Sequence, residues 1–166
     1  GNINKVKQIS NFCILFDKYM KNNDLTLSIY GEIVNNYSYK NIVKLNSDII
    51  YIHKAVSHEK VNNLLKGFKF IVIPSESEVF PIVYFEALKA NLIPIVNDIP
   101  FFRIICGKYS KHIFDINKAE TVKNTLYWAK NISFEEYLRY IVDLKYSFVN
   151  YYKRNSNNLK KVFDYS

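Results

Sequence analysis

Short runs of β-branched and aromatic residues alternate along the chain with longer stretches in which apolar residues recur at helical spacing. The strand-like runs are residues 25–30, 49–53, 68–73, 93–96 and 113–115. The helical stretches are residues 7–20, 37–45, 57–65, 81–90, 121–130 and 133–153. This alternation is typical of βαβ units, in which helices cover a parallel sheet. The pattern therefore predicts an α/β fold.

Individual residues mark the ends of several predicted elements. Ser57 fits the N-cap of the helix that follows it. The run 68–73 is continuously apolar, which predicts a strand buried on both faces, and Pro74 closes it. Pro81 suits the first position of a helix because its missing N–H would be unpaired there in any residue. Asn91 can adopt the left-handed conformation that ends such a helix.

The whole chain, residues 1–166, reads as a single domain without an internal repeat or a linker. Its last part, residues 133–166, is predicted to be a helical segment with an apolar stripe that packs on the core or, as the alternative, contacts a second domain or a membrane surface. The stripe consists of Tyr137, Ile141, Leu144, Phe148 and Tyr151. A helix begins within the first few residues with no strand before it. In a series of βαβ units, this predicts that the chain opens at the end of a strand whose remainder is absent or shortened.

The charge balance favours an anionic partner. Lysine and arginine number 23 against 15 aspartates and glutamates, which gives a formal net charge of +8. Nucleic acid, an anionic membrane face and a phosphorylated small molecule all fit such a field. Enrichment in Lys, Asn, Ile and Tyr, as in chains from AT-rich genomes, explains the same excess without any partner. The charge alone therefore does not choose a function.

Cysteine and histidine show no metal-ligand spacing. Cys13 and Cys106 lie far apart and form no CxxC pair, and we expect His53, His58 and His112 to be structural or surface residues. Two unpaired cysteines fit a reducing, cytoplasmic compartment. The longest apolar stretch, residues 79–96, is interrupted by charged residues and prolines, so it is not a membrane span.

One segment carries most of the chemical information. It is Pro74-Ser75-Glu76-Ser77-Glu78-Val79-Phe80-Pro81-Ile82-Val83-Tyr84-Phe85-Glu86-Ala87-Leu88, followed by the strand Ile93-Pro94-Ile95-Val96-Asn97-Asp98. A helix that starts at the carboxyl end of a parallel strand favours phosphate, because its free N–H groups and its dipole attract negative charge. Glu78, before the helix, could then accept hydrogen bonds from sugar hydroxyls, and Glu86, on the helix, from a ribose. Taken alone, Glu78 also fits a helix-start carboxylate in a capping box with Ser75.

This segment resembles the retaining glycosyltransferases of family 4 and their relatives with the GT-B fold. Their donor-binding domain carries P-S-x-x-E-x-F-x-x-x-x-x-E-A and then a P-V-I-x-x-D strand, so that the E-x7-E pair becomes Glu78 and Glu86. Weaker similarity extends over residues 1–130, where Lys7-Gln8 can be laid over the start of K-G-x-x-x-L-I-x-A-F. That alignment places Asn2 and Lys7 at the family's R-x4-K pair. The resemblance implies a three-layer Rossmann-like domain with a parallel sheet, the C-terminal half of a GT-B glycosyltransferase.

The resemblance also implies an activity and a set of site residues. The chain would serve transfer of a sugar from a UDP- or GDP-linked donor, with retention of configuration and without a metal or another cofactor, in polysaccharide or glycoconjugate biosynthesis. Glu78 would hold the donor sugar and Lys7 the leaving phosphates, and these two residues are the implied catalytic ones. The implied donor-binding residues are Glu86, Phe80, Pro81, Ile82, Val83 and Asn2.

The implied partners are a nucleotide sugar and a second domain. An N-terminal domain or a partner subunit would hold the acceptor, because acceptor residues of GT-B enzymes come from the other domain of the pair. Peripheral contact with an anionic membrane, at its inner face, is compatible with the charge. No nucleic-acid partner is expected.

Several positions depart from the family pattern. Asn2 replaces an arginine that the family uses on the donor diphosphate, a charge that Lys5 could supply. Val79 and Asn91 replace usual glycines, and Arg103 stands where the family often has glutamate. These departures keep a second reading open, a nucleotide-sugar-binding or regulatory module without catalysis. A basic nucleic-acid-binding domain is a third reading, and no nucleic-acid motif supports it.

Overall fold

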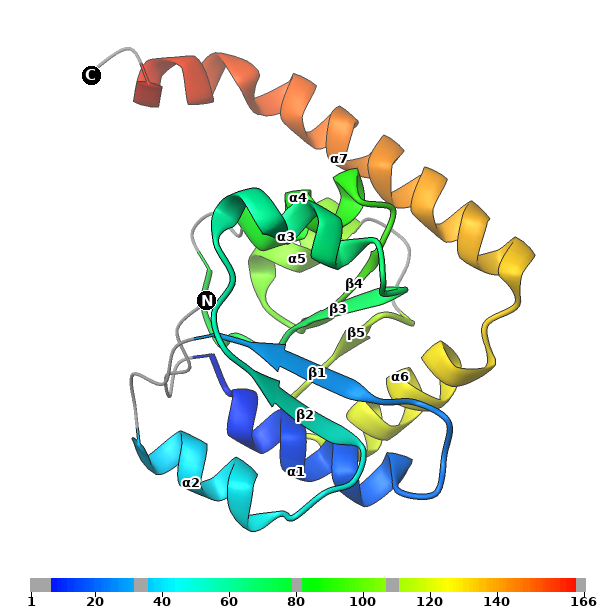
Figure 1. Cartoon of the computed structure of the whole chain (residues 1–166). Coiled ribbons are helices and arrows are strands. Elements are labelled where there is room, and N and C mark those ends of the chain that lie inside the picture. Colours follow the sequence, from blue (N-terminus) through cyan, green and yellow to red (C-terminus); the bar gives the residue numbers. More distant parts are fainter. Residues whose placement is uncertain (1–6, 32–35, 79–81, 107–110, 164–166) are drawn as a thin grey trace.

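The computed structural model describes residues 7–31, 36–78, 82–106 and 111–163, with side chains for 7–31, 39–78, 82–106 and 111–155 (Figure 1). The helices are α1 (Ile9–Met20), α2 (Asn36–Lys44), α3 (His58–Leu65), α4 (Ile82–Lys89), α5 (Pro100–Cys106), α6 (Ala119–Asn131) and α7 (Phe134–Phe163). The strands are β1 (Leu27–Tyr30), β2 (Ile50–His53), β3 (Phe70–Ile73), β4 (Ile93–Asn97) and β5 (Ile113–Phe114). Every helix and strand expected from the apolar pattern is present. The pattern missed α5, a short helix that begins at Pro100.

All strand pairs are parallel, as the α/β pattern predicts. The described strands fall into two sheets, one with the order β1-β2 and one with the order β3-β4-β5. Leu27 is opposite Ile50 in the first sheet, and Ile73 is opposite Val96 in the second. The fold is therefore α/β, with its parallel sheet divided between β1 and β3.

Helices cover both faces of these strands and make three layers (Figure 1). On one side, α1, α2 and α6 enclose a core that includes Phe12, Phe16 and Leu126. On the other side, α4, α5 and α7 enclose a second core around Tyr84 and Phe102. The helix α7 runs along this second side. Both layers depend on apolar side chains of the strands between them, which is the usual construction of such domains.

Strand β3, which borders the division of the sheet, is less buried than the sequence suggests. Strand β4 is buried at every position, because β3 and β5 pair with it on either side. The prediction that 68–73 is buried on both faces is wrong for most of β3, where Phe70, Ile71 and Val72 are only half-buried. Among the described strands, β3 has a neighbour on one side only. A strand with one neighbour leaves part of its side chains and one backbone edge uncovered.

The predicted helix ends are confirmed in part. Asn91 has φ 63° and ends α4 in the left-handed region, and Leu92 N–H then donates to the Ala87 carbonyl at 2.8 Å. Ser57 stands at the N-cap position of α3, but its side chain makes no capping hydrogen bond, so the expected cap is one of position only. Pro81, expected at the first position of α4, lies outside the described residues.

The apolar stripe of α7 packs on the second core, as expected. Ile141 and Leu144 are buried, and Tyr137, Phe148 and Tyr151 are half-buried against the same cluster. The helix continues to Phe163, ten residues beyond the predicted end at 153.

Both cysteines are buried and free. Cys13 lies in the first core and Cys106 in the second. Burial raises the pKa of each thiol to about 12. The two thiols are therefore alike in burial and in pKa, but they lie on opposite faces of the strands.

Candidate functional site

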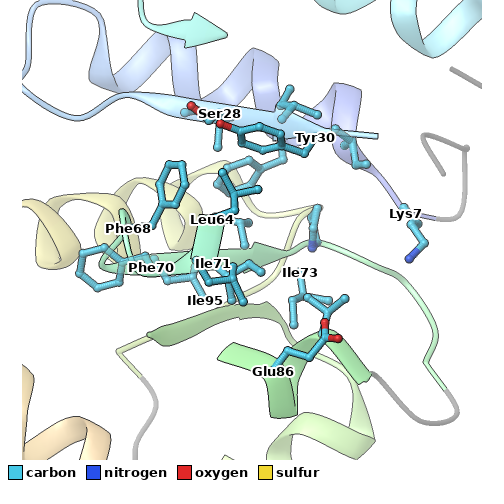
Figure 2. Close-up of a pocket in the computed structure, with 18 of the residues that line it drawn as sticks. Lys7, Ser28, Tyr30, Leu64, Phe68, Phe70, Ile71, Ile73, Glu86 and Ile95 are labelled. Carbon is cyan, nitrogen blue, oxygen red and sulfur yellow. The ribbon is translucent and has the colours of Figure 1, made fainter. Parts of the chain in front are cut away.

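A pocket of about 670 Å³ lies between β1 and β3, with helices on either side. One end of it is polar and includes the ionisable side chains of Lys7, His58, Glu78 and Glu86, which we call the polar rim. Figure 2 shows Lys7 and Glu86 at this end. The residues that follow β3, Pro74 and Ser75, also line the pocket. The polar rim therefore lies where β3 ends and α4 begins.

Glu86 is positioned by the apolar face of its own helix. Its neighbours Tyr84, Ala87 and Leu88 are buried, which orients α4 and leaves Glu86 toward the pocket. Its side chain is 22% exposed, and one carboxylate oxygen lies 3.7 Å from Nδ1 of His58, whose side chain is 87% exposed. Glu86 therefore lines the pocket from α4. An ion pair with so exposed a histidine contributes little to stability.

Glu78 lies in the loop that leads from β3 to α4, and a buried asparagine supports that loop. Nδ2 of Asn97 donates to the backbone carbonyl of Ser75 at 3.2 Å, and its Oδ1 accepts from the N–H of Ile116 at 2.9 Å. Ser75 is 2% exposed and Asn97 is 5% exposed. The amide thus ties the loop that carries Glu78 to the end of β5.

A second link holds the same loop to the start of α1. Nε2 of Gln8 donates to Oε1 of Glu76 at 2.6 Å, and Nδ2 of Asn11 donates to Oε1 of Gln8. Gln8 is buried and has φ 51°, a left-handed conformation that favours glycine. Lys7 precedes Gln8 and lines the polar rim. The link therefore holds Lys7 and the Glu78 loop at the same pocket.

The start of α4 lies beside the polar rim. Ile82 and Val83 line the pocket, with side chains 60% and 37% exposed. The first N–H groups of an α-helix have no acceptor within the helix, and the helix dipole is positive at that end. The first turn of α4 thus gives this end of the pocket the electrostatics that suit an anion.

Five of the eight predicted site residues line this one pocket: Lys7, Glu78, Ile82, Val83 and Glu86. The other three, Asn2, Phe80 and Pro81, lie outside the described residues. The same holds for Lys5 and Val79.

Asp98, which directly follows β4, forms a salt bridge with Arg103. Nε and Nη2 of Arg103 donate to its two carboxylate oxygens, and these hydrogen bonds hold the pKa of Asp98 below its usual range. Neither residue is among the described residues that line the pocket. The arginine that departs from the family pattern thus neutralises a carboxylate outside the polar rim.

Sequence reasoning assigned no role to Gln8 or Asn97. Asn97 carried a usable signal, because a polar residue ends an otherwise apolar, fully buried strand. The signal at Gln8 was weaker: this residue stands where the family motif K-G-x-x-x-L-I-x-A-F has glycine. Glu76 was visible only as one of several acidic residues in the loop.

The remaining histidines have structural positions. His112 is fully buried, and its ring meets that of Tyr140 edge-on at 5.7 Å. His53 stacks on Tyr30 at 4.3 Å. In the described part of the chain, no three His, Cys, Asp or Glu side chains gather as a metal site would need. Nor does any helix described here have an apolar stretch of membrane-spanning length.

Comparisons with known proteins show the family and the fold of the chain. The family model of "Glycosyl transferases group 1" matches residues 1–141. The catalytic domain of cholesterol-alpha-glucosyltransferase from Helicobacter pylori superposes with a TM-score of 0.71 at 20% identity, over 91% of this chain and 94% of that chain. The N-terminal domain of trehalose-6-phosphate phosphatase from Candida albicans superposes with a TM-score of 0.73 at 12% identity, over 90% of this chain and 36% of that chain. No curated protein matches the sequence. At these sequence identities, the similarity to the solved structures shows a shared fold and no shared function.

Proposed function

Because the chain belongs to the glycosyl transferases group 1 and has the fold of the C-terminal domain of a GT-B glycosyltransferase, we propose that its polar rim binds a nucleotide-diphosphate sugar, UDP- or GDP-linked. One observation carries the proposal. Lys7, which is remote in sequence from Glu78 and Glu86, lines the same pocket as these two glutamates beside the first turn of α4. A cation and a helix N-terminus are suited to binding a diphosphate. Two carboxylates are suited to accepting hydrogen bonds from the hydroxyls of a ribose and of a second sugar.

The diphosphate would lie between Lys7 and the start of α4. The leaving nucleoside diphosphate carries roughly two negative charges, and its departure needs electrostatic stabilisation that is in place before the bond breaks. Lys7 supplies a full positive charge, and the N–H groups of Ile82 and Val83 supply oriented dipoles. Asn2 would add a neutral hydrogen-bonding group in place of the family's arginine.

The two carboxylates would divide the sugars between them. Glu86 would accept hydrogen bonds from the ribose and so tie the nucleotide to α4. Glu78, in the loop before α4, would accept hydrogen bonds from the hydroxyls of the transferred sugar. Loss of the leaving group makes that sugar positively charged, so an adjacent carboxylate stabilises it more in the transition state than in the ground state.

Transfer would proceed with retention and without a metal, and the acceptor would be held by an N-terminal domain or a partner subunit. This follows from the family resemblance, because the acceptor residues of GT-B enzymes come from the other domain of the pair. We accordingly expect the 166-residue chain to bind donor without transferring its sugar.

Isothermal titration calorimetry of the chain with a panel of UDP- and GDP-linked hexoses tests the proposal. Binding of at least one donor, weakened by Glu86→Ala, is expected. Absence of binding across the panel would overturn it. Donor binding that persists in the reconstituted two-domain enzyme without any turnover would favour the alternative reading, a nucleotide-sugar-binding module without catalysis.

A further inference from the structure

The helix α7 carries a second apolar stripe, on a side that faces away from the core. The helix packs against α4, α5 and β4 through residues such as Ile141 and Leu144, and it lies on the outside of this helical layer (Figure 1). Six other large apolar side chains of α7 are exposed, from 43% for Val149 to 76% for Phe134. They are Phe134, Leu138, Val142, Tyr146, Val149 and Tyr152. We call these six residues the outer stripe.

The spacing of the outer stripe keeps it on one side of the helix. An α-helix has about 3.6 residues per turn, so residues three or four apart lie on the same side. The steps of four from Phe134 to Tyr146 move the stripe slightly around the axis, and the steps of three to Tyr152 move it back. The stripe therefore runs about 27 Å along α7. A continuous exposed apolar surface of this kind marks an interaction site.

The outer stripe is symmetric about its own centre, which lies between Asp143 and Leu144. Each member before the centre has a counterpart at nearly the same distance after it. A second α7 turned end for end would therefore place every member of the stripe opposite another member. The three resulting pairs are Val142 with Tyr146, Leu138 with Val149, and Phe134 with Tyr152. Such self-complementarity is what a two-fold interface between identical chains requires.

The charges beside the outer stripe have the same symmetry. Glu135 and Lys153 are both exposed, and they lie about five helical turns apart, which puts them on one line along the helix. In an antiparallel pair, Glu135 of each copy would lie opposite the partner's Lys153, whereas a parallel pair would bring like charges together. Lys145 also lies beside the stripe, and its ammonium donates to Oδ1 of Asn91, which directs it toward the body of the domain.

We propose that the outer stripe is a docking surface for a second copy of this chain, with the two α7 helices packed antiparallel about a two-fold axis near Leu144. The stripe and its flanking charges complement themselves, and this selects the second copy as the occupant. An anionic bilayer would instead repel Glu135, which borders the stripe. The inference goes beyond the proposed donor chemistry, because the polar rim contains no residue of α7.

Sedimentation velocity of the 166-residue chain tests the association. The parent should form a dimer with a Kd in the micromolar range. Val142→Asp places a carboxylate at the centre of the outer stripe in both copies and should raise the Kd at least about tenfold. Asn124→Asp, at an exposed position of α6, is the matched control and should dimerise as the parent does. Circular dichroism verifies that both variants are folded. A monomeric parent would overturn the proposal, and so would a dimer that Val142→Asp does not weaken.

Charge reversal tests the antiparallel direction. Glu135→Lys alone and Lys153→Glu alone should each raise the Kd, because each places like charges opposite each other at two symmetric sites. The double variant should return the Kd to near that of the parent. A double variant that dimerises no better than either single variant would overturn the antiparallel pairing. Binding to vesicles of anionic lipid that Val142→Asp abolishes, in a chain that stays monomeric, would assign the outer stripe to a membrane and overturn the proposal.

Engineered cysteines test the register. Val142→Cys and Tyr146→Cys are made as separate chains and mixed under a mild oxidant. The mixed disulfide should form faster than the disulfide of either variant with itself, because the two positions lie opposite each other in the proposed pair. Cys13 and Cys106 should not react, since both are buried and their pKa is raised to about 12. Faster disulfide formation within each variant alone would indicate a parallel pair and contradict the proposal.

Discussion

The side-chain amide of Gln8 donates a hydrogen bond of 2.6 Å to the carboxylate of Glu76, 68 residues further along the chain. Gln8 adopts a left-handed backbone, which costs an ordinary residue about 1–2 kcal/mol. The bond therefore holds a strained residue in place. Lys7 is adjacent to Gln8 and Glu78 lies two residues after Glu76, so this contact links the two segments that carry the cation and the carboxylate of the polar rim.

Removing the acceptor of that bond should loosen the rim. We expect Glu76→Ala to lower the free energy of unfolding by about 1 kcal/mol, the ordinary net value of a partly exposed hydrogen bond. Urea denaturation followed by circular dichroism measures the change. Glu59→Ala, which removes an exposed glutamate from α3, is the matched control and should change stability by less than about 0.5 kcal/mol. Equal stability of both variants would show that the Gln8 bond does not hold the loop.

Glu86 and Glu78 should affect different parts of the donor. We expect Glu86→Ala to weaken the binding of free nucleoside diphosphate and of nucleotide sugar alike, because both ligands carry the ribose. Loss of hydrogen bonds to a charged acceptor costs about 1.5–3 kcal/mol, or roughly tenfold to more than a hundredfold in Kd. Glu78→Gln should leave the Kd of free nucleoside diphosphate unchanged and should lower turnover most in the two-domain enzyme. Calorimetry with both ligands measures the difference.

The same pair of variants provides its own controls. Glu59→Ala should bind both ligands as the parent does. If Glu86→Ala and Glu78→Gln remain folded and both bind free nucleotide with the parent's Kd, the donor site lies elsewhere in the protein.

Asn97 should matter for stability although it does not line the pocket. We expect Asn97→Ala to lower the free energy of unfolding by about 2–4 kcal/mol, because it removes two buried hydrogen bonds and leaves the N–H of Ile116 without its acceptor. The variant should also weaken donor binding, since the loop that carries Glu78 loses its tie. Thermal unfolding and calorimetry measure the two effects. Asn124→Ala, on an exposed position of α6, should leave both near the parent values.

Stability should fall between pH 6.5 and pH 4 because of His112. Burial lowers the pKa of this histidine from 6.5 to about 4, so the unfolded chain binds a proton in that range and the folded chain does not. Folding stability from this group is therefore complete above pH 6.5 and is lost as the pH falls toward 4, by about 3 kcal/mol. Urea unfolding at a series of pH values measures the slope. In His112→Leu the slope over this range should become shallower, and a parent-like slope would assign the pH dependence to other groups.

The sequence by itself determined the order of strands and helices, most of their limits, and the segment that carries the polar rim. These follow from local features, because the spacing of apolar residues and the position of Asn91 act within one element. The spacing of Glu78 and Glu86 also needs no more than one loop and one helix. The parallel α/β class followed from the alternation of the elements alone.

The tertiary structure decided which remote side chains meet. The bond from Gln8 to Glu76 and the tie from Asn97 to Ser75 join segments whose approach depends on packing between layers, and no local pattern encodes such distances. Burial of β3 was misjudged for the same reason. An apolar run shows that a strand can be covered on both faces, but the number of strands that pair with it is a property of the assembled sheet.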